Sequence, residues 1–166
     1  MNVQSTAARP QRWPHRYIVV LEDEMLRTEL AALDESIGDR RPSALLRAEL
    51  LAARKRVYEA LHPSSRHGGA PGRAGGGKAP RSMRTAPPVR SHAADAALRT
   101  GLSERSIRQL IQIAEGIPAS LRDLIRDTPL ARRQRLLLEV ARARRDPEEQ
   151  RRRLRAALGT PVFAGA

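Results

Sequence analysis

The chain has 166 residues and a formal net charge of +13, with no cysteine and only one Trp, two Tyr and one Phe. The lack of cysteine excludes disulfides, thiolate metal sites and cysteine nucleophiles. Because aromatic residues are scarce, any core must be built from Leu, Ile, Val and Ala, and this composition favours an all-α protein with small helical packings.

The charge is unevenly distributed along the chain. Residues 21–61 contain nine acidic and seven basic side chains, whereas residues 62–90 contain six basic side chains and no acidic one. A clustered positive excess suits a polyanion, because each neutralised phosphate releases condensed counterions. A GC-rich coding sequence would produce the same excess of arginine, so charge alone leaves nucleic-acid binding open.

The sequence contains no signal for a membrane. No apolar run approaches the roughly 20 residues needed to span a bilayer, and the first residues have no apolar signal core. We therefore expect a cytoplasmic protein without a membrane partner. Residues 1–16 are expected to be disordered.

The first structured unit is expected over residues 17–62. Residues 17–21 (YIVVL) have the composition of a short strand, although no partner strand is evident. Apolar residues then recur at helical spacing over residues 23–37 and 42–61, and the short connection predicts an antiparallel helical hairpin. The predicted apolar faces consist of Leu26, Leu30, Leu33 and Ile37 in the first helix and of Leu46, Leu50, Ala53, Val57 and Leu61 in the second.

Residues 63–90 are rich in Gly, Pro and basic side chains, which predicts a flexible basic linker. Within this linker, residues 72–78 (GRAGGGK) match the first seven positions of a phosphate-binding loop. Ala79 stands where that loop needs Ser or Thr for magnesium, and Pro80 obstructs a following helix. We therefore interpret the segment as linker and expect no cofactor.

Several short helices are predicted between residues 91 and 158, followed by a tail over residues 159–166. The first two, over residues 93–100 and 103–115, have the pattern of a helix-turn-helix. Ala97 is the small residue where the helices cross, and Gly101 permits a positive φ in the turn. The residues expected to lock the second helix onto the first are Leu102, Ile107 and Leu110. Further helices are predicted over residues 120–126, 128–144 and 146–159.

The outward face of the second helix of this motif carries polar side chains. Arginine and glutamine bind guanine and adenine edges bidentately in the major groove, so this face is chemically suited to reading DNA. The candidate base-reading residues are Ser103, which can also cap the helix, and Glu104, Arg105, Ser106, Arg108, Gln109 and Gln112. The alternative is an ordinary helical hairpin with a glycine turn.

Ten arginines lie between residues 132 and 155. The apolar residues among them must face a core, so Arg132, Arg133 and Arg144 are expected to point outward. They are candidates for contacts with DNA phosphates. A solvated helix face is the alternative interpretation.

The segment HAADAALRTGLSERSIRQLIQIAEGIP (residues 92–118) resembles the helix-turn-helix of the ParB-type (ParB/RepB/Spo0J-like) partition proteins. Further similarity lies upstream in EDEMLRTEL (residues 22–30) and ARKRVYEALHPSSRHGGAPG (residues 53–72), and downstream in TPLA and PEEQ (residues 128–131 and 147–150). The resemblance implies sequence-specific binding of double-stranded DNA in chromosome or plasmid partition, or in plasmid or phage maintenance.

The resemblance covers the central part of that family. The family's N-terminal nuclease-like domain and its Gly-Glu-Arg-Arg nucleotide motif are missing, and residues 39–41 (DRR) do not replace them. CTP binding is therefore not expected. His62 and His67 lack a third ligand nearby, so no metal site is expected, and no constellation of catalytic side chains predicts an enzyme.

Several functions remain open from the sequence. A transcriptional regulator would use the same motif as a partition protein, and an adaptor would instead use the acidic hairpin to dock a partner protein. A single small helix-turn-helix usually acts as a pair of copies, so a homodimer on DNA is expected. A nucleoid- or plasmid-associated location follows from the DNA-binding interpretation.

Overall fold

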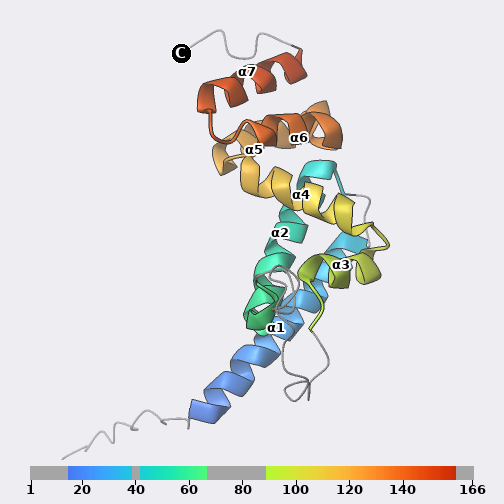
Figure 1. The fold of residues 1–166 in the computed structure, drawn as a ribbon, viewed down its shortest axis with the longest axis vertical. Coiled ribbons are helices and arrows are strands. Elements are labelled where there is room, and N and C mark those ends of the chain that lie inside the picture. Colours follow the sequence, from blue (N-terminus) through green and yellow to red (C-terminus); the bar gives the residue numbers. More distant parts are fainter. Residues whose placement is uncertain (1–14, 39–41, 67–88, 160–166) are drawn as a thin grey trace, which may run out of the picture.

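A computed structural model describes residues 15–38, 42–66 and 89–159, which form α-helices, two short 3-10 helices and no strand (Figure 1). The predicted all-α class is confirmed. The α-helices are α1 (His15–Gly38), α2 (Ala44–Leu61), α3 (His92–Thr100), α4 (Glu104–Gly116), α5 (Ala119–Arg126), α6 (Gln134–Arg142) and α7 (Pro147–Leu158), and the 3-10 helices are η1 (Pro63–Ser65) and η3 (Pro129–Arg132).

The strand predicted for residues 17–21 is wrong, because these residues belong to α1. β-branched composition is a weak preference that depends on a neighbouring strand for its hydrogen bonds. No strand is present in the described parts of the chain to supply that partner. A helix satisfies the backbone donors and acceptors within the segment itself, so the helical pattern of residues 23–37 extends back to His15.

The predicted hairpin of α1 and α2 is present, with the two helices running antiparallel (Figure 1). Ser43 begins α2 as its N-cap, because its side chain accepts a hydrogen bond from the backbone N–H of Leu46. Ile37 is buried at the end of α1. The other apolar residues predicted to face α2 are partly buried, namely Leu26, Leu30 and Leu33.

The apolar face predicted for α2 is wrong in its register. Leu46 is exposed, and Leu50, Ala53 and Leu61 are only partly buried, so Val57 alone of the five predicted residues is buried. The face that is buried instead carries Leu45, Ala48, Leu51, Arg54, Val57 and Tyr58. Because Arg54 lies in the middle of this face, the pattern of apolar residues in the sequence does not identify the face as buried.

The hairpin and the downstream helices share one hydrophobic core. α2 is the central helix and lies against α1 on one side and α4 on the other, with α3 and α5 also in contact (Figure 1). The buried cluster joins Leu45 and Leu51 of α2 to Ile107 and Ile113 of α4 and to Leu137 of α6. The residues that we expected to form two separate units therefore pack as one body. Of the predicted linker over residues 63–90, residues 67–88, including the GRAGGGK segment, lie outside the described residues, whereas its first residues form η1.

Arg54 ties three helices together inside this body. Its side chain is fully buried, and its Nε donates to Asp34 Oδ1 of α1 at 2.5 Å while its Nη2 donates to Asp95 Oδ2 of α3 at 2.7 Å. Burial alone disfavours the charged guanidinium, but the hydrogen bonds to Asp34 and Asp95 outweigh burial and raise the pKa of Arg54. Asp95, in the first turn of α3, thus holds this helix against the hairpin.

α3 and α4 form the predicted helix-turn-helix, joined by residues 101–103. Gly101 has φ +69° and ends α3, with its N–H bonded to the carbonyl of Ala97. Ser103 caps α4 by accepting from the N–H of Ser106. Of the predicted locking residues, Ile107 and Leu110 are buried and Leu102 packs against the core.

The turn assignment makes a stability prediction at Gly101. A Cβ added there meets no atom within 4 Å, so the cost of Gly101→Ala comes only from the left-handed backbone. We expect a loss of about 1–2 kcal/mol in the free energy of unfolding, measured by urea denaturation of the full chain. Gly38→Ala is the matched control, because its Cβ also meets open space but its φ is not positive. Equal stability of the two variants would remove the turn assignment.

The helix predicted over residues 128–144 is divided into η3 and α6, with a break at Arg133 (φ −97°, ψ 80°). The two parts face different neighbours, since η3 packs on α2 and α5 whereas α6 packs mainly on α4 and α7. The last helix was predicted correctly, with Asp146 as its N-cap and Gly159 (φ +63°) at its end.

Candidate nucleic-acid interface

The outward face of α4 carries the candidate base-reading residues. Arg105, Arg108 and Gln112 are exposed at positions i, i+3 and i+7, so they lie along one side of the helix. Gln109 is partly buried beside them. The opposite side of α4 is anchored in the core by Ile107, Leu110, Ile111, Ile113 and Ala114.

Four of the predicted residues have local partners at the start of α4. The Ser103 and Ser106 hydroxyls are 2.9 Å apart and hydrogen-bonded. Glu104 forms an ion pair with Arg108, one turn further along. Ser103 is therefore a capping residue, and Glu104 orients Arg108 on the helix surface.

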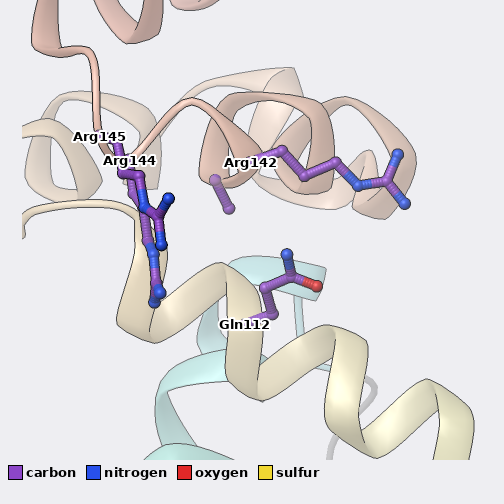
Figure 2. A pocket seen from close by; sticks show the side chains of 5 residues that line it. Gln112, Arg142, Arg144 and Arg145 are labelled. Atoms are coloured by element: carbon purple, nitrogen blue, oxygen red, sulfur yellow. The ribbon is translucent and has the colours of Figure 1, made fainter.

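A hollow of about 500 Å³ lies between α4 and the segment that follows α6. It is lined by Gln112, Ala141, Arg142, Arg144 and Arg145 (Figure 2). Figure 2 shows Arg144 and Arg145 extending toward α4 and Gln112 pointing from α4 toward α6, while Arg142 extends along another direction. Arg144 was expected to point outward, but its place beside Gln112 could not be read from the sequence.

A second, open hollow of about 370 Å³ adjoins the first and shares Gln112 and Arg144 with it. Its basic side chains are Lys55, Arg66, Arg108 and Arg144, and its acidic ones are Glu59 and Glu115. Lys55 is bonded to Glu115 at 2.8 Å, which fixes α2 against α4. The two hollows together follow one side of α4 from the helix-turn-helix to the turn after α6.

Several arginines of this surface have no carboxylate partner in the described parts of the chain. Some arginines elsewhere are paired, as Arg126 is with Glu49 and Arg153 with Glu149. Among the described residues, no carboxylate lies within 4.0 Å of Arg105, Arg142, Arg144 or Arg145. Their positive charge is therefore available to an anion.

Arg132 and Arg133 are exposed but lie apart from these hollows. They stand at the end of η3, which packs against α2 and α5, and neither lines either hollow beside α4. The structure thus brings Gln112 together with Arg142, Arg144 and Arg145. Of the three predicted phosphate-contact residues, only Arg144 belongs to that group.

The turn after α6 is held against α4 by a close helix contact. A Cβ on Gly116 would lie 2.7 Å from the Ala141 carbonyl oxygen, so only glycine allows this approach. Buried Gln150 of α7 donates from Nε2 to the carbonyl oxygens of Gly116 at 2.7 Å and Val140 at 3.1 Å. These contacts fix the arginines of the turn relative to Gln112.

His92, at the start of α3, is buried at the inner edge of the second hollow. Burial and then the positive charges of Arg54 and Lys55 lower the pKa of His92 to about 4, against the smaller opposing influence of Asp95 and Asp34. Its Nε2 is buried and has no hydrogen-bond partner among the described residues. His92 is therefore neutral at neutral pH and is a structural residue, and a direct contact with phosphate is not favoured.

Comparison with protein-family models, curated proteins and solved structures gave no match for this chain. Within the described residues, no group of three or more His, Cys, Asp or Glu is arranged to hold a metal ion. None of the helices in those parts of the chain is long and apolar enough to cross a membrane.

Proposed function

We propose that this protein binds double-stranded DNA in a sequence-specific manner, with α4 in the major groove and the arginines after α6 on the phosphate backbone. The observation that carries the proposal is the exposed side of α4. Arg108 and Gln112 line the hollows there together with Arg144, and Gln112 also lies beside Arg145. Arg105 is exposed one turn before Arg108 on the same side of the helix. Side chains suited to base edges thus adjoin unpaired positive charge suited to phosphates. The proposed DNA-binding protein is not an enzyme.

The process that this DNA binding serves is proposed from the resemblance to ParB-type proteins. We favour a role in partition or in plasmid or phage maintenance, with the protein at the nucleoid or on a plasmid in the cytoplasm. A transcriptional regulator would use the same face of α4. A non-enzymatic adaptor is a separate candidate, favoured by the acidic surface of α1, where Glu22, Glu24 and Glu29 are exposed.

Base reading and phosphate contact are separable by mutation. Alanine at Arg105 or Arg108 should lower the preference for a selected duplex over random DNA, because each bidentate contact discriminates by about 1–3 kcal/mol. Alanine at both Arg144 and Arg145 should weaken binding to the two DNAs about equally and flatten the salt dependence. The measurement is the ratio of the two affinities at one fixed salt concentration, after a site has been selected from random duplexes.

The control for this experiment is the double variant Arg132→Ala/Arg133→Ala. These arginines are exposed but lie away from α4, so their removal should change both affinities less than removal of Arg144 and Arg145 does. If no site can be selected, or if the Arg105 and Arg108 variants keep the wild-type ratio, α4 does not read bases and the adaptor becomes the better proposal.

We further expect a homodimer on DNA. One short helix-turn-helix contacts only a half-site, and a two-fold pair gains affinity on a palindrome. Light scattering of the protein with a selected duplex should give two chains per duplex, and the selected site should be palindromic. One chain on a non-palindromic site would contradict this prediction.

A further inference from the structure

The N-terminal half of α1 projects away from the other helices (Figure 1). Its apolar side chains are not covered there: Leu21 is 59% and Met25 is 72% exposed. The partly buried apolar residues of α1, such as Leu26 and Leu30, lie on a different side of the helix. α1 thus has a second apolar face that the described residues leave open.

This second face has the spacing of a coiled-coil seam. Leu21, Met25, Thr28 and Ala32 follow one another at intervals of four, three and four residues, and all four are exposed. The Thr28 hydroxyl donates to the carbonyl oxygen of Glu24 at 3.0 Å, so it needs no partner across the seam. We name these four residues the outer seam. The spacing is that of helices that pack side by side along a shared apolar stripe.

The charges beside the outer seam define what can pack on it. Glu22 and Glu29 lie on one side of the seam and Glu24 on the other, and all three are exposed. The nearest basic side chain on this stretch of α1, Arg27, lies further round the helix and within 3.7 Å of Asp23. The seam is therefore flanked by negative charge on both sides, in a chain whose net charge is +13.

A second copy of α1 does not fit this pattern. Parallel or antiparallel pairing of two identical seams would bring flanking glutamates against flanking glutamates. A helix with an apolar stripe between Lys or Arg residues would instead bury Leu21 and Met25 and pair with the glutamates. We propose that the outer seam of α1 docks a basic amphipathic helix of a partner protein. This inference is independent of the proposed binding of DNA by α4.

Two synthetic helical peptides test the proposal with the full chain. Both carry Leu along the seam, one has Lys and the other Glu at the flanking positions, and binding is measured by calorimetry. We expect the Lys peptide to bind at least about tenfold more tightly than the Glu peptide. Met25→Asp should lower the affinity for the Lys peptide by about tenfold or more, because burial of that side chain is lost.

Met25→Asp also separates docking from simple charge attraction. The variant makes α1 more acidic, so attraction alone would strengthen binding of the Lys peptide. Leu98→Asp on α3 is the matched control, since Leu98 is 66% exposed and is not part of the seam; this variant should not weaken binding. The triple variant Glu22→Lys/Glu24→Lys/Glu29→Lys should reverse the preference between the two peptides.

Three results would overturn the proposal. The first is that the Lys peptide does not bind, and the second is that Met25→Asp binds the Lys peptide as tightly as the wild type does. The third is that the wild type is a dimer and Met25→Asp is a monomer, which would identify a second copy of the chain as the occupant of the seam. Duplex binding should be the same for the wild type and Met25→Asp. Failure of the seam to bind the peptide and failure of α4 to bind DNA are thus recorded by different measurements.

Discussion

Replacing Arg54 with methionine should lower the free energy of unfolding by about 3–5 kcal/mol, because it breaks a buried ion network by removing its central member. Asp34 and Asp95 would be left without their cation where α1 and α3 meet α2. Methionine keeps much of the side-chain volume, so the loss would report the charge network more than a cavity. Urea denaturation of the full chain, followed by circular dichroism, measures the change.

Two further variants identify the cause of this loss. Arg56→Met lies on the same helix at an exposed position and should change stability by less than about 0.5 kcal/mol. The triple variant Arg54→Met/Asp34→Asn/Asp95→Asn removes the stranded carboxylates and should regain part of the stability lost by Arg54→Met alone. If Arg54→Met is as stable as Arg56→Met, Arg54 is not the residue that ties the three helices together.

Acid should destabilise the protein in a pH window set by His92. The pKa of His92 is about 4 in the folded protein and about 6.5 in an unfolded chain, so between these values the unfolded state binds more protons. The contribution of His92 to stability is therefore complete above pH 6.5, falls as the pH decreases, and reaches a loss of about 3 kcal/mol near pH 4. Denaturant titrations at several pH values between 4 and 7 measure this slope.

His92→Gln removes the ionisable ring and should flatten the slope in that window. His62→Gln is the matched control, because the rings of His62 and His92 both pack near Tyr58, at 4.6 and 5.8 Å between centroids. The slope should persist in His62→Gln. Identical slopes in the wild type and His92→Gln would mean that protonation of His92 does not oppose folding.

The sequence was most informative where local signals begin and end helices. Ser103, Gly101 and Asp146 act at chain positions adjacent to the backbone groups that they cap or turn, so the helix-turn-helix and the last helix were predicted within one or two residues. The strand at residues 17–21 failed because β-branched composition needs a partner strand, and no strand exists in the described parts of the chain.

Long-range packing accounts for the other differences. The buried face of α2 contains Arg54, whose partners Asp34 and Asp95 are 20 and 41 residues away in sequence. No local pattern assigns an arginine to a core when its counter-charges lie on two other helices. The break at Arg133 likewise arises because η3 and α6 pack on different neighbours.

The candidate interface was likewise predictable where it depends on local sequence and not where it depends on long-range packing. The polar face of α4 was evident from helical spacing, since its members are close in sequence. The position of Arg142, Arg144 and Arg145 beside Gln112 depends on the contact of α6 with α4, which lie in different parts of the sequence. Arg144 could therefore be expected to point outward, but its position beside Gln112 of α4 could not be predicted.

The contact of Gly116 with Ala141 and the two hydrogen bonds from Gln150 hold α4 and the turn after α6 in a fixed arrangement. In the proposed complex, the base-reading and phosphate-binding side chains would already have their mutual spacing before DNA arrives. Little backbone entropy would then be lost on association. A duplex whose groove width does not match the spacing between the base-reading and phosphate-binding side chains would have to deform on binding. Because this deformation costs free energy, the protein would prefer DNA whose groove already has the matching width.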